Sequence, residues 1–221
     1  MSRESSFAPG FASVVIDVDS TLCGIEGIDW LAERCGPSVG QAVAAFTDQA
    51  MRGEIPLGKV YGARLALVRP TVADVAALAE AYAAALAPGA AEALDRLRRS
   101  GRRVVLVSGG LRDAIMPVAR QLGMPDADVH AVEVRRDARG VYLGYDEASP
   151  LSQATGKPDI VRSLALPSRI LAVGDGATDL AMRPAVDAFA AFTGFVARPP
   201  VVALADVVVT SFDQLVELVL A

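Results

Sequence analysis

The sequence predicts an α/β fold in which a parallel sheet carries a helical insert directly after its first strand. The β-branched run 14–16 is apolar throughout, which is typical of a strand buried on both faces of a sheet. Residues 26–86 then have helical periodicity with no strand among them. From residue 88 onward strands alternate with helices, the pattern of a parallel sheet with right-handed crossovers.

Length and composition limit the possibilities further. A chain of 221 residues has room for one domain with an insertion rather than for two full-size domains. An apolar content of 52% with 21% charged residues indicates a soluble globular protein. The net charge of −5 argues against a nucleic-acid or anionic-membrane surface, because either needs a concentrated basic patch.

The same composition suggests a cytoplasmic protein. No apolar run approaches the roughly 20 residues that span a bilayer, and the N-terminal residues lack the apolar stretch of a signal peptide. The two cysteines, Cys23 and Cys35, form neither a disulfide framework nor a metal cluster, so both are expected to be reduced.

The insert is expected to contain four helices with recognisable ends. Ser38 and Thr71 are suitable N-caps for the second and fourth helices. Pro56 opens the third, since proline is accepted in the first turn. The four helices are predicted over residues 26–34, 38–51, 56–68 and 71–86.

The remaining elements alternate along the chain. A hairpin is predicted between residues 129–134 and 141–145, and Ser211 with Gln214 suggests a capping box for the last helix. The other strands are expected at 103–107, 170–173, 188–192 and 207–209, with helices at 90–100, 111–122, after Pro158, before Pro184 and from 211 to the end.

Polar clusters follow several of the predicted strands. Asp17 and Asp19 come directly after the first strand and project the same way if the extended conformation continues, although an Asp-rich turn is an equally good interpretation. Ser108-Gly109-Gly110 follows the second strand, as an anion-binding helix start or simply as a turn. Because parallel strands end at the same edge of a sheet, we expect such groups to converge.

A second acidic pair and a lysine complete the set. Asp175 and Asp179 follow the strand at 170–173, where they are either helix-capping acids or oxygen ligands for a hard cation such as Mg²⁺. Lys157 is one of only two lysines among 21 basic residues, and it follows a glycine. A surface position is the alternative, but an ammonium near carboxylates favours phosphate neutralisation.

These residue types suit phosphoryl transfer, in which the protein mainly positions groups and neutralises charge. A carboxylate can also act as the nucleophile and form an aspartyl-phosphate that water cleaves. The single histidine, His130, lies inside a predicted strand and is an unlikely nucleophile, and the chain has no G-x-x-x-x-G-K-[ST] loop.

The chain resembles a known superfamily at these positions. The haloacid dehalogenase superfamily has four motifs that are similar, in order, to D-V-D-S-T, V-S-G-G, G-K and G-D-G-A-T-D. Within it, the phosphoserine phosphatase family is similar at D-V-D-S-T-L-C-G-I-E-G-I-D, A-R-L-A-L-V-R-P and V-D-A-F, and the similarity extends from residue 13 to the end. The resemblance implies a Rossmann-like, three-layer α/β/α core of residues 1–23 and 87–221, with residues 24–86 as a small helical-bundle cap.

The resemblance also implies roles for individual residues. Asp17 would be the nucleophile and Asp19 the general acid and later the base, with Lys157 and Ser108 holding the phosphoryl group and Gly109 supplying an amide. Mg²⁺ would be held by Asp17, the main-chain carbonyl of Asp19, and Asp175, with Asp179 supporting them.

In the cap, Glu26 would face the substrate ammonium and Arg64 its carboxylate, with Thr178 and Arg198 also lining the pocket. Taken alone, Arg64 is typical of an exposed helix charge and Glu26 of a first-turn acid. A zwitterionic amino acid nevertheless needs one anion and one bidentate cation, and arginine suits a carboxylate.

The implied reaction is Mg²⁺-dependent hydrolysis of O-phospho-L-serine, a small phosphomonoester, through an aspartyl-phosphate. The alternative within the superfamily is a phosphatase or phosphotransferase acting on another small phosphate such as phosphohomoserine or phosphoethanolamine. A non-catalytic phospho-ligand or protein-binding module would require a damaged motif, and all four are intact. The sequence leaves open whether the protein is a monomer or a homodimer.

Overall fold

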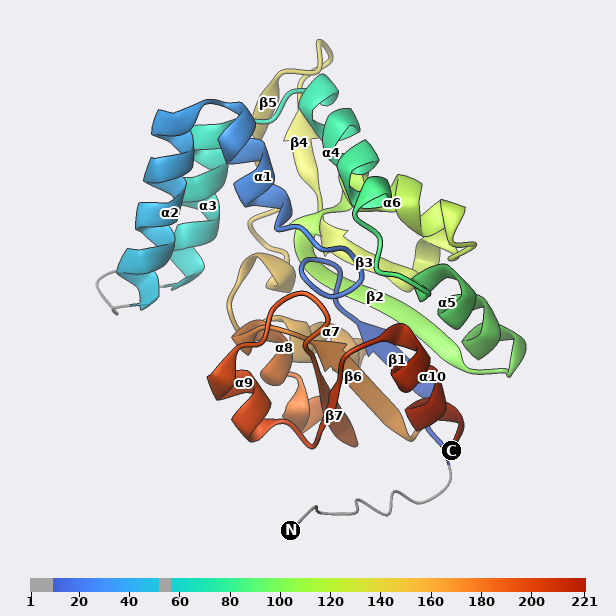
Figure 1. Cartoon of the computed structure of the whole chain (residues 1–221). Coiled ribbons are helices and arrows are strands. Elements are labelled where there is room, and N and C mark those ends of the chain that lie inside the picture. The colour runs from blue at the N-terminus through green and yellow to red at the C-terminus, as the bar shows by residue number, and fades with distance from the viewer. Residues whose placement is uncertain (1–9, 52–56) are drawn as a thin grey trace.

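The computed structural model describes residues 10–51 and 57–221. Its centre is a parallel sheet of six strands in the order β3-β2-β1-β6-β7-β8 (Figure 1). The six strands are β1 (Ser13–Ile16), β2 (Arg103–Leu111), β3 (Val129–Val132), β6 (Ile170–Gly174), β7 (Ala188–Phe192) and β8 (Val207–Val209). The chain builds the sheet outward from β1 in one direction and then from β6 in the other, so the strand order reverses between β1 and β6. Ligands of open α/β sheets bind at such a reversal.

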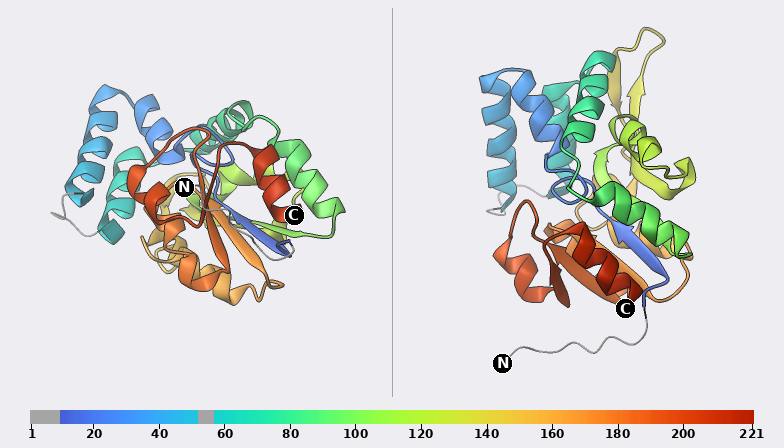
Figure 2. Two further views of the ribbon diagram at one scale, coloured as in Figure 1. Left: turned by 60° about the horizontal axis from the view of Figure 1, so that its bottom comes forward. Right: turned by 45° about the vertical axis from the view of Figure 1, so that its right-hand side comes forward.

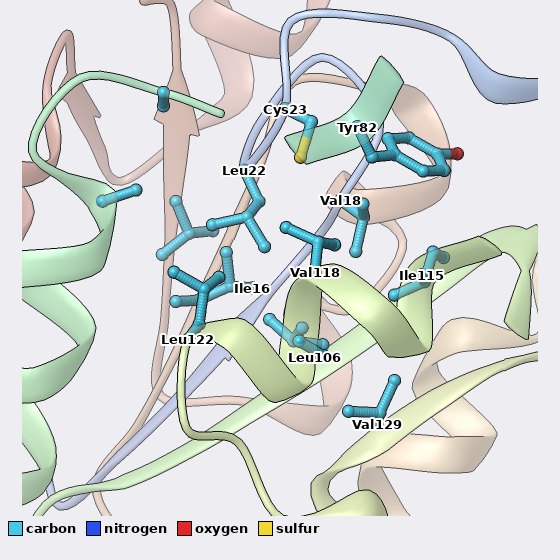
Figure 3. Close-up of a cluster of buried hydrophobic side chains, with 14 of the residues drawn as sticks. Ile16, Val18, Leu22, Cys23, Tyr82, Leu106, Ile115, Val118, Leu122 and Val129 are labelled. Atoms are coloured by element: carbon cyan, nitrogen blue, oxygen red, sulfur yellow. The ribbon is translucent and has the colours of Figure 1, made fainter. Parts of the chain in front are cut away.

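Helices cover both faces of the sheet, and the sheet separates the core into two hydrophobic clusters. Successive residues of β1 point to opposite faces, so Val14 and Ile16 join one cluster and Val15 the other. The first cluster is shown in part in Figure 3, where Ile16 and Leu106 lie against α6. On this face the sheet is covered by α5 (Ala90–Arg99), α6 (Arg112–Gln121) and α10 (Phe212–Leu220), and on the other by α7 (Lys157–Ser163), α8 (Ala177–Leu180) and α9 (Pro199–Leu204). The inserted helices also contribute residues to the first cluster.

Four helices are inserted between β1 and α5, and they begin and end at neighbouring points of the chain. Gly24 N donates to Ala85 O at 2.8 Å, and Ala87 N donates to Leu22 O at 2.9 Å, so the outgoing and returning segments are hydrogen bonded to each other. Figure 2 shows from two further sides that the second and third of these helices stand apart from the six strands. The four are α1 (Gly27–Arg34), α2 (Pro37–Met51), α3 (Leu57–Val68) and α4 (Val72–Ala84).

A separate antiparallel hairpin, β4 (Val134–Arg136) and β5 (Tyr142–Tyr145), stands at the top of the molecule in Figure 1. Its Tyr145 ring packs edge-on against Tyr61 of α3, with 5.1 Å between the ring centroids. Three 3₁₀ turns complete the structure: η1 (Asp126–Asp128), η2 (Pro150–Ser152) and η3 (Arg183–Ala185). None of the helices in the described ranges is long and apolar enough to cross a membrane.

Several predicted boundaries were wrong. Residues 129–132 form a parallel strand of the main sheet beside β2, and only 134–136 pair with β5, because a break at residue 133 separates the two short strands. The segment Ser108-Gly109-Gly110 continues β2 with a register shift instead of forming a turn, and α6 begins only at Arg112. Helix α9 was not predicted.

The helix caps also differ in part. Thr71 accepts from Asp74 N at 3.1 Å, and the Asp74 side chain accepts from Thr71 N, which confirms the predicted cap. Helix α2 begins at Pro37 rather than after Ser38. The predicted box at α10 is half formed, because Gln214 accepts from Thr210 N. The predicted helix start at Pro56 lies outside the described residues.

Candidate active site

A cavity of about 260 Å³ lies at the carboxyl ends of β1 and β6, under the inserted helices. Residues from six segments far apart in the sequence line it, and two of these segments follow the adjacent parallel strands β1 and β6. The lining residues are Asp17, Asp19, Glu26, Ile28, Val60, Tyr61, Arg64, Gly109, Leu151, Ser152, Gln153, Ala154, Lys157, Asp175, Gly176, Thr178, Asp179 and Arg198. The predicted site residues therefore converge, apart from Ser108.

Three buried carboxylates and one buried ammonium form the floor of the cavity. One oxygen each of Asp17, Asp175 and Asp179 lie within 4.8 Å of one another. Lys157 Nζ donates to Asp17 Oδ1 at 2.6 Å and to Asp179 Oδ1 at 2.5 Å. Burial lowers the Lys157 pKa, but the two carboxylates outweigh it and raise that pKa, so the ammonium stays charged.

Two glycines near this cluster leave no room for a side chain in their place. A Cβ on Gly174 would lie 2.2 Å from Asp179 Cγ, and one on Gly156 would lie 1.7 Å from Pro150 O. Asp179 also caps its own short helix, since its Oδ2 accepts from Gly176 N at 2.9 Å. Gly174 thus lets the helix that carries Asp179 approach the end of β6 closely, and Gly156 lets the start of the lysine-bearing helix pack against η2.

Asp19 is held apart from the other carboxylates, and it is not part of the group that could hold a metal through carboxylate oxygens. Its Oδ1 accepts from Tyr82 Oη at 2.6 Å and from Gly27 N at 3.1 Å. Burial, and next the negative charge of Glu26, raise the pKa of Asp19 to about 7, although both hydrogen bonds oppose the rise. Asp19 can therefore exchange a proton near neutral pH, as a general acid or base must.

Arg198 connects the floor of the cavity to the inserted helices. Its Nε donates to Asp175 Oδ2 at 2.8 Å, and its Nη2 lies 3.2 Å from Glu26 Oε1. Glu26 also accepts from Ser20 Oγ at 2.8 Å, and Ser20 has a left-handed φ of 53° in the turn after β1. The Glu26 carboxylate therefore faces the cavity from the N-terminus of α1, where it has non-helical N-cap geometry.

Arg64 and Tyr61 form the wall on α3. Arg64 Nη2 donates to Asp29 Oδ2 of α1 at 2.5 Å, while Arg64 Nε is buried without a partner among the described residues. Tyr61, one helical turn away, also has a buried hydroxyl with no partner there. Both residues line the same cavity as the carboxylates, and the Arg64 guanidinium gives this side a positive charge that can bind an anionic group of a ligand.

The other predicted binding residues differ in whether they line the cavity. Gly109 and Thr178 line the cavity. Ser108 is fully buried and does not line it, and its Oγ accepts from Gly110 N at 2.9 Å, because β2 extends through this motif. Three residues at or beside the site were not predicted, namely Tyr61, Tyr82 and Ser152. Nothing in their local sequence distinguishes them from core and turn residues.

The floor of the cavity fits a divalent cation. Burial raises the pKa of both Asp17 and Asp175, and the charge of Asp179 raises each further. Lys157 and Arg198 offset this only in part. A hard cation that takes carboxylate oxygens would relieve the remaining repulsion. The donor set, three buried carboxylates within one small volume, is therefore that of a divalent metal site.

The chain is similar to known proteins of one family. A model of the haloacid dehalogenase-like hydrolase family matches residues 14–183. The phosphoserine phosphatase of Bos taurus is 38% identical over 206 residues, which cover 92% of this chain and 91% of the bovine protein. The chloroplastic phosphoserine phosphatase of Arabidopsis thaliana is 38% identical over 209 residues, covering 92% of this chain and 70% of the plant protein.

Among solved structures, a phosphoserine phosphohydrolase-like protein from Francisella tularensis subsp. tularensis SCHU S4 superimposes with a TM-score of 0.82. It is 25% identical, and the match covers 94% of this chain and 99% of that one. The inserted helices and the sheet are thus both included in the likeness.

Proposed function

This chain belongs to the haloacid dehalogenase-like hydrolase family, and from that membership we propose that it hydrolyses O-phospho-L-serine to L-serine and phosphate. The observation that carries the proposal is the cavity in which Asp17, Asp19 and Lys157 meet beneath Glu26 and Arg64. This cavity has a group of suitable charge for each part of the substrate, namely its phosphate, its alkyl leaving group, its ammonium and its carboxylate.

The first half of the reaction transfers the phosphoryl group to Asp17. A carboxylate oxygen of Asp17 forms a bond to phosphorus while the bond from phosphorus to the serine oxygen breaks. Asp19 donates its proton to that oxygen, so serine leaves as the neutral alcohol. The Lys157 ammonium, 2.6 Å from Asp17 Oδ1, offsets the negative charge of the transferring group.

The second half regenerates the enzyme. Asp19, now ionised, takes a proton from water as the water oxygen forms its bond to phosphorus. The bond between phosphorus and Asp17 breaks, and inorganic phosphate leaves. A pKa of about 7 lets Asp19 serve in both directions near neutral pH.

We assign the divalent cofactor as Mg²⁺, held by the carboxylates of Asp17 and Asp175 and the main-chain carbonyl of Asp19, with Asp179 supporting them. When bound, the cation supplies electrostatic stabilisation of the phosphoryl oxygens. The support for this assignment is the all-oxygen donor set, which suits a hard cation.

Substrate recognition is assigned to the residues that face the cavity from the insert. Glu26 binds the ammonium of phosphoserine, and Arg64 binds its carboxylate through the guanidinium group, on the α3 wall of the cavity. The Gly109 amide and Thr178 contact the phosphate end, whereas Ser108 does not line the cavity and instead accepts from Gly110 N within β2. Residues 24–86 act as a cap that excludes water during the first half-reaction, over a core of residues 1–23 and 87–221.

We also propose a cytoplasmic location. Its support is the pair of free cysteines, of which Cys35 is exposed, since exposed thiols persist in a reducing compartment. Fractionation of cells with an antibody to the protein tests this directly, and recovery with an organelle or envelope fraction would contradict it.

The central experiment measures phosphate release from a panel of small phosphomonoesters with Mg²⁺ and with a chelator. We expect phosphoserine to have the highest kcat/KM and the chelated enzyme to be inactive. Asp17→Asn should reduce turnover at least about 10³-fold, because the amide is a very poor nucleophile. Near wild-type hydrolysis by this variant would show that Asp17 is not the nucleophile.

Arg64→Ala separates phosphoserine from other small phosphates. The variant should lose kcat/KM for phosphoserine by about 10²-fold, the value of a charge-assisted hydrogen bond, while an aryl phosphate without a carboxylate should be affected less than about threefold. Equal losses on both substrates would favour an alternative substrate without a carboxylate, such as phosphoethanolamine. Phosphohomoserine has the same carboxylate and ammonium as phosphoserine, so the substrate panel distinguishes it by its kcat/KM. Addition of an alcohol, with assay for a transferred phosphate, tests phosphotransferase activity.

A further inference from the structure

Tyr82 of α4 makes a contact that the chemistry assigned so far does not use. The side chain is fully buried, and its hydroxyl donates to Asp19 Oδ1 at 2.6 Å. The amide of Gly27 donates to the same oxygen at 3.1 Å. Within the described part of the chain, the hydrogen bonds to this carboxylate therefore end on Oδ1, and Oδ2 is left for the cavity that Asp19 lines.

The position of the Tyr82 hydroxyl is fixed by the residues around it. A Cβ on Gly27 would lie 2.1 Å from Tyr82 Oη, and one on Gly110 would lie 3.2 Å from it. The ring belongs to the hydrophobic cluster on the α6 face of the sheet, which also contains Val18 and Ile115 (Figure 3). Two glycines, one from the insert and one from β2, thus leave space that the hydroxyl fills.

We propose that Tyr82 is a positioning residue that directs the acid proton of Asp19 toward the leaving serine. The inference rests on the proposed function. With two donors on Oδ1, a protonated Asp19 carries its proton on Oδ2, because Oδ1 is already occupied as an acceptor. That proton passes to the serine oxygen as its bond to phosphorus breaks and the bond from Asp17 to phosphorus forms.

A buried tyrosine can also serve stability alone, and the two roles differ in one measurable respect. Serine leaves as a strongly basic alkoxide unless it is protonated, whereas nitrophenolate is stable at neutral pH and needs no proton. A fault in proton delivery therefore affects phosphoserine and spares p-nitrophenyl phosphate. A loss of folded protein affects both substrates equally.

The test compares kcat/KM of Tyr82→Phe for the two substrates, in the presence of Mg²⁺. This parameter covers the steps up to departure of the first product, so the later role of Asp19 as a base does not enter it. The ratio between the substrates is independent of the fraction of folded enzyme. We expect kcat/KM for phosphoserine to fall about tenfold or more, the effect of losing a hydrogen bond to a carboxylate that becomes charged as its proton leaves. The value for p-nitrophenyl phosphate should change less than about twofold.

Tyr142→Phe is the matched control, since Tyr142 is a buried phenol on β5 that does not line the cavity. Its substrate ratio should equal that of the wild type. An unchanged ratio in Tyr82→Phe, whatever its stability, would overturn the positioning role and leave the proposed function intact. A wild-type enzyme that releases no phosphate from phosphoserine would instead overturn the proposed function itself.

A second variant tests the packing on which the inference depends. Gly27→Ala places a methyl group where the Tyr82 hydroxyl lies, so it should lower the melting temperature of the wild type. In the Tyr82→Phe background the same change should lower it much less, because the nearest ring atom is then 3.0 Å away. Equal effects in both backgrounds would contradict the assigned position of the hydroxyl.

Discussion

The pKa of Asp19 predicts that the metal-free protein loses stability as pH rises through neutrality. In the folded protein this pKa is about 7, whereas an unperturbed aspartate titrates at 3.8. Between these values the folded state holds a proton that the unfolded state has lost. The contribution to stability is therefore present at low pH and disappears as pH rises through the folded pKa.

The size of this loss in stability follows from the linkage between proton binding and folding. The folded carboxyl is about nine-tenths protonated at pH 6 and about nine-tenths ionised at pH 8, so Asp19 contributes about 1.4 kcal/mol less to the free energy of unfolding at pH 8. For a chain of 221 residues that loss corresponds to a fall of about 3–6 °C in melting temperature.

Other groups titrate in the same interval, so the comparison needs a variant that differs only at this carboxyl. His130 acts in the opposite direction, since burial lowers its pKa. Asp19→Asn keeps an oxygen that can accept from Tyr82 and Gly27 and keeps all the other groups. Urea titrations in EDTA at pH 6 and pH 8 should show the wild type losing about 1.4 kcal/mol relative to the variant. Parallel changes, or a wild type that gains with pH, would refute the assigned pKa.

Two further perturbations test the floor of the cavity and its surroundings. Lys157→Met should lower the free energy of unfolding, measured in urea, by about 3–5 kcal/mol, because it leaves buried carboxylates without their ammonium. Addition of Mg²⁺ should restore part of the loss. A variant as stable as the wild type without metal would contradict the assigned ion pairs. Gly156→Ala should cost about 2–3 kcal/mol, since its Cβ would collide with Pro150 O. Gly40 lies on α2, and an added Cβ there would be 3.8 Å from its nearest neighbour, Glu33 Cα of α1. Gly40→Ala should therefore stabilise by up to about 1 kcal/mol, and an equal loss in both variants would refute the steric argument.

The sequence predicted the part of the site that depends on strand ends. An apolar run followed by Asp17 marks where a buried strand must stop, and the parallel register then brings Asp175 and Lys157 to the same edge. The helical insert was also predictable, because four amphipathic segments occur without a strand between them. The strand end and the insert are both recognised from periodicity over several residues, which can be read from the sequence alone.

What the sequence did not predict depends on partners distant along the chain. Tyr82 lies 63 residues from Asp19 and sits in an alanine-rich helix, where its local pattern is that of an ordinary core residue. The extension of β2 through Ser108 was missed because glycines usually end strands, and here a register shift accommodates them. Residues 129–132 have the pattern of a strand, but a strand pattern alone does not specify which neighbour it pairs with.

The hydrogen bonds that join Leu22 to Ala87 and Gly24 to Ala85 make the insert a closed loop with a single base. A segment of another length could be exchanged for it without moving the two ends, and the entropy of closing a longer loop grows only logarithmically. Replacement of this one contiguous stretch of chain, in evolution or by engineering, can thus change which phosphate ester the cavity admits. Asp17 and Lys157 would remain where they are.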